Sequence, residues 1–345
     1  ALKLSADGWI AMPSEDIDMD INFNAPSTDF RDFLSLIPNA YIEGFENIKS
    51  SGKFDLSGFV KGVYGTNPER YPAFKINLDV NNGQVQYPDL PLGIGDIFAD
   101  ILIDSKTSDL NDMIVDISKF KMKIGNNPID AKMNLKTIMT DPNVDAFVKG
   151  KLDLAELAKA FPTEGVSDMN GTITSDISMK TKYSTIENED YENVDMSGNL
   201  GIENMNYVAE DMPPIQINAL QMAFNPKAVE VNNFDSKLGK SDLRANGSID
   251  NILAYFSPEK TMKGTFNVRS NYFNADEWMT EESSQSAVSI SQSESVEDSS
   301  SDEELFNRFD FNLEGEIEKL DYDIYNIENI VAKGNFKPNE LTINQ

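Results

Sequence analysis

Residues 73–80 read AFKINLDV, and this stretch decides the fold class because apolar and polar side chains alternate along it. Its apolar positions are Phe74, Ile76, Leu78 and Val80. In an extended chain such positions share one face, so the stretch predicts a strand with one dry and one wet face. The same alternation recurs at residues 17–23, 144–148, 220–224, 266–268 and 309–313.

Antiparallel pairing is the expectation for such strands, because parallel strands that are buried on both faces read as continuous apolar runs. Tight hairpin turns are predicted at the Asn-Gly pairs, whose residues tolerate positive φ: 82–83, 170–171 and 246–247. Three segments switch to helical spacing and run into a proline: 29–37, 153–161 and 249–256. Helices this short are not stable alone, so we expect them to cover ends or edges of the sheet.

The chain carries 58 acidic and 29 basic side chains, a formal charge of −29, with no cysteine and no histidine. The missing residues exclude disulfides, thiolate nucleophiles and the usual zinc sites. The acidic balance repels phosphate backbones, so nucleic acid is not expected as a partner. No cofactor and no metal site is predicted.

Three short motifs resemble functional sites, and each lacks a required part. A calcium-loop-like start at Asp16 has Ile21 where glycine is needed and Ser27 where a bidentate glutamate belongs. GIGDIF, from Gly93, has two of the three glycines of a dinucleotide fingerprint, and SPEK, from Ser257, has no companion motif. The sequence therefore predicts a protein that is not an enzyme. A hydrolase that uses paired carboxylates is the remaining enzymatic alternative.

One segment differs in composition from the rest of the chain, and the rest of the chain contains a weak internal sequence repeat. Residues 281–304 hold ten serines and eight acidic residues without Lys, Arg or aromatics, which predicts a disordered loop. Residues 117–137 align with 231–251 at an offset of 114, and similar offsets recur along the chain, as expected for laterally stacked β units. We therefore expect four parts: a β-rich repeat unit with short helices at 1–162, a second at 163–280, the loop at 281–304 and the start of a third, truncated unit at 305–345.

A family resemblance adds to this interpretation. Residues 213–279, with PPIQINALQMAF, DLRANGSIDNILAYF and MKGTFNVRSNYFNADEWM, resemble the C-terminal region of AsmA-like proteins, and residues 71–162 resemble it less closely. AsmA-like proteins are related to TamB and to the bridge-like lipid-transfer proteins, whose long sheet curls into a half-pipe with an apolar concave face. The resemblance implies a periplasmic protein of diderm bacteria, anchored in the inner membrane by an N-terminal helix outside this stretch. It also implies movement of phospholipid between the inner and outer membranes, for lipid balance and assembly of the outer membrane.

The leading prediction is a mostly β fold: a long, twisted and curved antiparallel sheet built from weak repeats, forming a half-pipe or open groove. Too few helical segments exist to cover the apolar face, so we expect ligand to cover it. The expected partner is a phospholipid or another acyl lipid, with the membrane reached through an anchor outside this fragment. The residues assigned to the lipid groove are Ile76, Leu78, Val80, Val148, Leu152, Leu220, Met222, Phe224, Phe266, Val268, Phe311 and Leu313.

Two other interpretations stay open at this point. In a closed sandwich, the same alternating residues would form only a core. In a structural or adhesive β-rich scaffold, acidic wet faces bearing Tyr87, Tyr207 or Tyr255 would bind protein or glycan partners. Aspartate placed on the apolar face separates these cases, because it unfolds a closed core but leaves an open face folded.

Overall fold

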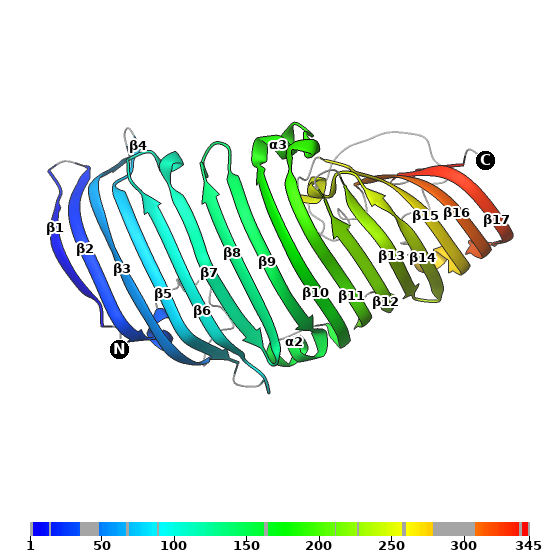
Figure 1. Cartoon of the computed structure of the whole chain (residues 1–345), viewed down its shortest axis with the longest axis horizontal. Coiled ribbons are helices and arrows are strands. Elements are labelled where there is room, and N and C mark those ends of the chain that lie inside the picture. Colours follow the sequence, from blue (N-terminus) through cyan, green and yellow to red (C-terminus); the bar gives the residue numbers. More distant parts are fainter. Residues whose placement is uncertain are drawn as a thin grey trace. The chain divides into compact units, whose positions relative to one another are not determined.

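The computed structural model describes residues 3–343 except 14, 35–47, 67–68, 88–89, 162–164, 211, 226–227, 257–259, 279–307 and 338–339. Within these residues, seventeen strands form one mixed sheet that is not closed, and the α-helices are three in number and short. Figure 1 shows the strands side by side. The prediction of a mostly β, open sheet with few helices is therefore confirmed. The segment predicted as a disordered loop, 281–304, lies outside the described residues.

The chain divides into two compact units, residues 1–164 with 173–198 and residues 165–172 with 199–345. In the first unit, successive strands pair antiparallel, β3 pairs with β5, and β4 pairs with β3 alone. Its strands are β1 (Ser5–Ala11), β2 (Ile17–Asp29), β3 (Lys49–Thr66), β4 (Glu69–Arg70), β5 (Ala73–Gln86), β6 (Ile94–Ser105), β7 (Ile114–Ile124), β8 (Asn127–Lys136) and β9 (Asn143–Asp153).

Two strands have residues in both units, β10 (Val166–Lys182) and β11 (Asp195–Ala209). The second unit continues with β12 (Ile215–Phe224), β13 (Val229–Leu238), β14 (Ser241–Ile249), β15 (Met262–Asn274), β16 (Phe309–Tyr322), β17 (Tyr325–Lys337) and β18 (Glu340–Ile343). The α-helices are α1 (Phe30–Leu34), α2 (Leu154–Ala160) and α3 (Tyr183–Glu187). Single 3₁₀ turns are η2 (Leu110–Asp112), η3 (Tyr191–Asn193), η4 (Ile252–Phe256) and η5 (Ala275–Trp278).

The three predicted helices occur, with different extents. α2 matches its prediction, and the Asp153 carboxylate accepts a hydrogen bond from the Glu156 amide at its start. α1 begins where predicted, but residues 35–37 lie outside the described part of the chain. The third forms the 3₁₀ turn η4, which begins at Ile252 because Ile249 is the last residue of β14.

Purely antiparallel pairing is wrong at one place. β15 and β16 pair in parallel, from Met262 opposite Phe309 to Asn274 opposite Asp321. A parallel pair needs a long connection, and residues 275–308 supply it. β16 alternates like the other strands because a sheet with one wet face imposes period two on parallel strands as well, so alternation alone does not encode strand direction.

The Asn-Gly pairs are not hairpin turns, and that prediction is wrong. All three lie inside strands: β5, β10 and β14. Asn82 has a φ of 53° beside a register shift between β5 and β6, as in a bulge. Gly247 lies opposite Phe266, and a Cβ there would collide with the β15 backbone, so glycine here permits close approach of strands. Two-residue turns occur instead at 125–126, 239–240 and 323–324.

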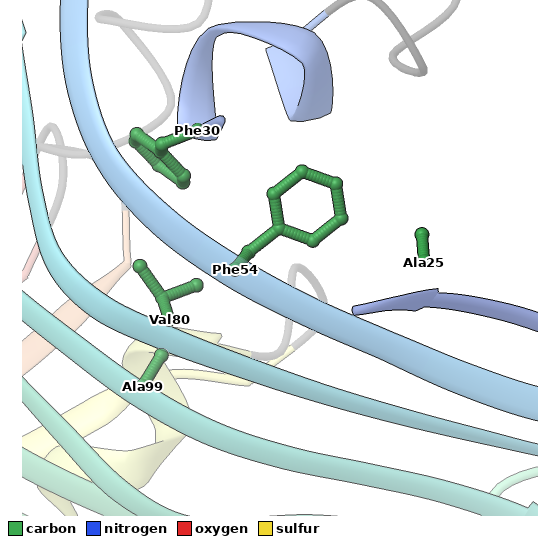
Figure 2. Packing of buried hydrophobic residues seen from close by; sticks show 5 residues of the cluster. All are labelled: Ala25, Phe30, Phe54, Val80 and Ala99. Atoms are coloured by element: carbon green, nitrogen blue, oxygen red, sulfur yellow. The ribbon is translucent and has the colours of Figure 1, made fainter. Parts of the chain in front are cut away.

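The core of the first unit forms where its sheet is bulged. Phe54 of β3 is fully buried, and Phe30 of α1, Val80 of β5 and Ala99 of β6 surround it (Figure 2). Register shifts occur near this point in the pairings of β2, β3, β5 and β6. Bulges bend strands and increase their twist, so here the sheet bends around the aromatic side chain that α1 covers.

The weak sequence repeat is a repeat of structure. Hairpins β7–β8 and β13–β14 share one register at an offset of 114 residues. Each carries a bulge at the equivalent place, after Ile117 in β7 and after Val231 in β13. Each turns at a glycine in the left-handed region, Gly125 with φ 57° and Gly239 with φ 60°.

A glutamate closes each of these two turns. It comes from the short helix after the next strand, α2 in the first unit and η5 in the second. Glu156 Oε2 accepts a hydrogen bond from the Asn126 amide at 3.1 Å, and Glu277 Oε2 accepts one from the Lys240 amide at 2.8 Å. A Cβ at Gly125 or Gly239 would collide with the respective carboxylate. Both repeats therefore contain the same contact, which joins a hairpin to the short helix that follows the next strand.

We predict that Glu156→Ala destabilises the protein by about 1–3 kcal/mol, because the Asn126 amide and the buried Asn127 side chain lose a charged acceptor. Urea unfolding followed by circular dichroism measures the change. Glu230→Ala, an exposed site in β13, serves as the control and should change stability little. Equal midpoints for the two variants would contradict the role given to Glu156.

Candidate functional site

The register places the five groove candidates of the first unit on one face. Leu78 lies directly opposite Leu56 on one side and Ile101 on the other, and directly opposed residues share a face. Continuing strand by strand gives rows of apolar residues across the sheet. One row is Leu56, Leu78, Ile101, Ile117, Met133 and Ala146; a second is Phe54, Val80, Ala99, Phe120, Ala131 and Val148; a third is Phe23, Gly58, Ile76, Ile103, Val115, Leu135 and Val144.

The seven candidates of the second unit also lie on one face, in three neighbouring rows. None of these rows contains a charged residue. They are Leu220, Phe234, Ala245, Val268, Gly315 and Ala332; Met222, Val231, Gly247, Phe266, Leu313 and Gly334; and Phe224, Val229, Ile249, Gly264, Phe311 and Phe336. We call the rows of each unit its apolar face.

Glycines shape the aromatic part of the second apolar face. Phe266 and Phe311 meet edge to face with ring centroids 5.2 Å apart, and Phe309 stacks on Phe336 at 4.9 Å. A Cβ at Gly264 would come within 3.3 Å of both Phe266 and Phe311. The missing side chain therefore makes room for the rings to lie over the strands.

Most residues of the two apolar faces are half-buried. Val148 and Phe336 each keep 38 % of their surface exposed. Buried apolar side chains in the first unit are found at Phe54 and its neighbours, beside α2, and after η3 at Val194 and Met196. Partly exposed apolar rows of this length are typical of interaction surfaces for proteins, membranes or ligands.

Several residues of the apolar faces were not predicted from sequence. Ile101 and Ile103 belong to a run, ILI, that does not alternate, and Phe120 follows a bulge that shifts the period by one residue. Pairing with Ile76 and Leu78, which do alternate, would have identified them. Such pairing is not visible in a single sequence.

The opposite face of the first unit carries cross-strand ion pairs. Lys61 lies 2.7 Å from Asp20, and Lys149 lies 2.5 Å from Asp176. The hydrogen bond and charge of Asp20 raise the pKa of Lys61, so this lysine stays charged. Exposed pairs contribute little stability, but they keep this face hydrated.

Like charges also meet on that face. Asp79 lies directly between Asp55 and Asp100 on the neighbouring strands. Partial desolvation raises the pKa of Asp79, and the charges of Asp100 and Asp55 raise it further, while Lys119 lowers it. Within the described residues no group of three or more carboxylates is arranged to hold a metal ion. Asp20, from the calcium-loop-like segment that starts at Asp16, pairs with Lys61.

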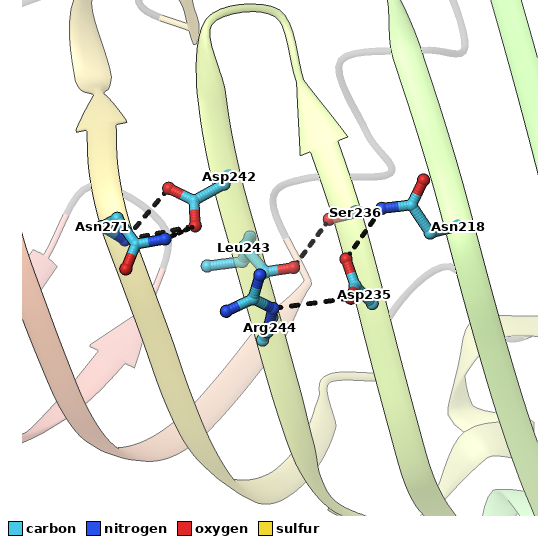
Figure 3. Close-up of polar contacts among 7 residues, drawn as sticks. All are labelled: Asn218, Asp235, Ser236, Asp242, Leu243, Arg244 and Asn271. Atoms are coloured by element: carbon cyan, nitrogen blue, oxygen red, sulfur yellow. Dashed lines mark hydrogen bonds and ion pairs between the residues drawn. The ribbon is translucent and has the colours of Figure 1, made fainter.

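Side chains replace backbone pairing where β15 separates from β14. The Asp242 carboxylate accepts hydrogen bonds from the backbone amide of Asn271 at 3.0 Å and from the Asn271 side chain at 2.7 Å (Figure 3). It also accepts one from the backbone amide of Tyr272 at 2.8 Å. Burial alone would raise the pKa of Asp242, but the two amides and the charge of Arg244 outweigh it, and the pKa lies below its ordinary value. Figure 3 also shows Asp235 between Asn218 and Arg244.

We predict that Asp242→Asn destabilises the protein at pH 7 by about 1–3 kcal/mol, since charged acceptors are the strong ones. A carboxylate with a lowered folded-state pKa stabilises above its ordinary pKa, and this contribution is lost as the pH falls through the folded-state value. The difference from wild type should therefore shrink below about pH 4. Urea unfolding at several pH values measures it.

Asp250→Asn is the matched control, because Asp250 is exposed and its carboxylate accepts a long hydrogen bond, 3.4 Å, from the Ser248 hydroxyl. A penalty for Asp242→Asn that is no larger than this control, or that grows toward acid pH, would contradict the assignment.

Three further observations on the described residues concern a hollow, the predicted tyrosine contacts and the lengths of the helices. A hollow of about 310 Å³ lies between residues 49–51, 84–86 and 93–95 in the first unit, lined mainly by Ser, Gln and Gly. Tyr87, a candidate contact for a scaffold protein, is half-buried against Phe161, whereas Tyr255 is 42 % exposed. Among the helices of the described residues, none is long and apolar enough to cross a membrane.

Comparison with known proteins gives no relative. No protein-family model matches the sequence, and neither a curated protein nor a solved structure is similar to it. Functional inference therefore depends on the apolar faces and on the sequence resemblance already described.

Proposed function

We propose that the chain is a non-enzymatic lipid-handling protein whose apolar faces bind the acyl chains of phospholipids or similar lipids. The observation that carries the proposal is the set of uncharged apolar rows, each of at least six residues, that run across the strands in each unit. These rows include all the groove candidates except Leu152, which continues the Val148 face two residues along from Gly150.

The chemistry of the faces favours acyl chains over other ligands. Their side chains are aliphatic or phenylalanine, without the hydrogen-bonding groups that orient a polar substrate. Acyl chains need none, because burying apolar surface contributes about 25 cal/mol per Å² wherever it occurs. Binding by area also explains why no single residue stands out as a site.

The cellular setting follows from the resemblance to AsmA-like proteins. On that basis we propose a periplasmic location, anchoring in the inner membrane, and transfer of phospholipid toward the outer membrane. Support for this part comes from residues 213–279 alone, and the apolar faces are compatible with it.

We predict that Val268→Asp lowers lipid occupancy at least about tenfold, because lipid would bury the new carboxylate without a partner. Asn267→Asp is the control: it adds the same charge to the same strand but on the opposite, exposed face. Native mass spectrometry of the purified protein after incubation with phosphatidylethanolamine vesicles measures occupancy.

Thermal unfolding of the same two variants separates an open face from a closed core. On an open face the new carboxylate stays hydrated until lipid binds. The free energy of unfolding of Val268→Asp should therefore lie within about 1 kcal/mol of that of Asn267→Asp. A loss of several kcal/mol, or no lipid on the wild-type protein, would overturn the proposal and favour a core or a protein-binding scaffold.

A further inference from the structure

Along β15, β16 and β17 of the second unit, one face of the sheet changes from apolar to charged. Figure 1 shows these strands side by side, and directly opposed residues share a face. Beyond the apolar face, toward the β16–β17 turn, the register gives three further rows: Ser270, Ile317 and Ile330; Tyr272, Lys319 and Glu328; and Asn274, Asp321 and Asn326. The side of the sheet that carries the stacked phenylalanines therefore ends, on the same strands, in polar and charged side chains.

Three residues of these rows, Tyr272, Lys319 and Asp321, contact one another, and we call them the polar cluster. The Tyr272 hydroxyl donates a hydrogen bond to Asp321 Oδ2 at 2.7 Å, and Lys319 Nζ lies 5.3 Å from the centre of the Tyr272 ring. The hydrogen bond to Asp321, together with desolvation and the carboxylate charge, raises the pKa of Tyr272. The phenol therefore keeps its proton and remains a donor.

The ammonium of Lys319 has donors for a further partner. Its distance to Asp321 Oδ1 is 3.5 Å, which is long for a charged hydrogen bond, and 45 % of the Lys319 side chain is exposed. An ammonium has three N–H donors, and the Tyr272 ring attracts it without using a conventional acceptor. Arg308, at the other end of β16, instead donates to the Tyr255 carbonyl of η4 at 3.2 Å. Lys319 is thus a cation on the apolar side of the sheet that can bind an anion.

The apolar part of these strands is long enough for a membrane acyl chain. From Phe311 to Lys319, β16 spans roughly 26 Å at about 3.3 Å per residue. The hydrocarbon of one leaflet is about 15 Å thick, half of a bilayer core. A phospholipid whose headgroup lies at Lys319 therefore has room for its chains over Ile317, Gly315 and Leu313.

We propose that the polar cluster is a headgroup site for phospholipids that carry a primary amine, with the phosphate at Lys319 and the ammonium at the carboxylates of Asp321 and Glu328. The inference rests on the proposed function and deepens it by naming the headgroup. One cation beside two carboxylates complements a zwitterion, whereas the carboxylates would repel a headgroup with net negative charge.

The same groups favour a primary amine over choline. A primary ammonium has three N–H donors for the carboxylates, and the quaternary ammonium of phosphatidylcholine has none. Choline binds instead through aromatic rings, and Lys319 already covers the ring of Tyr272. Phosphatidylethanolamine is therefore the expected ligand.

The test is a competition between phosphatidylethanolamine and phosphatidylcholine with matched acyl chains, supplied in equimolar vesicles and read by native mass spectrometry. On the wild-type protein, phosphatidylethanolamine should exceed phosphatidylcholine at least about threefold, as expected for a partly exposed charge pair. Asp321→Asn keeps an acceptor for the Tyr272 hydroxyl but removes the charge, so it should move the two lipids toward equal occupancy. Lys319→Gln should lower the occupancy of both lipids, because both carry the phosphate.

Glu316→Gln and Lys333→Gln are the matched controls, because they remove the same charges from the opposite, exposed face of β16 and β17. Both should bind the two lipids as the wild type does. The wild-type ratio tests the proposal even where a variant fails to fold. Equal occupancy on the wild type, or a ratio that Asp321→Asn leaves as high as Glu316→Gln does, would overturn the headgroup site and leave the proposed function intact. Absence of bound lipid would overturn both.

Discussion

Direct pairing of apolar residues across neighbouring strands is the constraint on which the structure depends. Once Leu78 lies opposite Leu56 and Ile101, a shift of either partner by one residue would place the apolar set in water. The register shifts that do occur are bulges, which restore the pattern after one extra residue. The same constraint accounts for glycine at Gly247 and Gly264, because rings from adjacent strands need that space.

In both repeats, a side-chain hydrogen bond outside the backbone ladder holds a hairpin in place on this one-sided sheet. Glu156 and Glu277 each join a glycine turn to a helix that follows the next strand, so three strands are held together by a contact that is not part of the backbone ladder. Asp242 likewise joins β14 to β15 through side-chain hydrogen bonds where the backbone pairing of these strands ends. These carboxylates act through directed hydrogen bonds, unlike the exposed ion pairs of the opposite face.

Much of the fold can be predicted from the sequence, and the failures have physical causes. Leu78 and Phe266 were placed on a dry face because alternation is a local property of one strand. The parallel pairing of β16, the role of Asn82 in a bulge and the membership of Phe120 in a row depend on a partner strand, which one sequence does not reveal. The turn at Gly125 was missed for a related reason: the Glu156 carboxylate that closes it comes from 31 residues further along the chain.

Under the proposed function, the regularity of the rows has a consequence for movement. A ligand that shifts by one strand, about 4.8 Å, exchanges contacts with Leu78 for contacts with Ile101, and a second such shift brings it to Ile117. These side chains are similar in size and polarity. Because binding by area depends on how much surface is buried and not on which residue buries it, successive positions have similar energies. A deep site would hold one lipid, whereas equivalent rows let lipid pass laterally along the sheet with small barriers. A charge in any one row would break this equivalence, and the rows that make up the two apolar faces contain none.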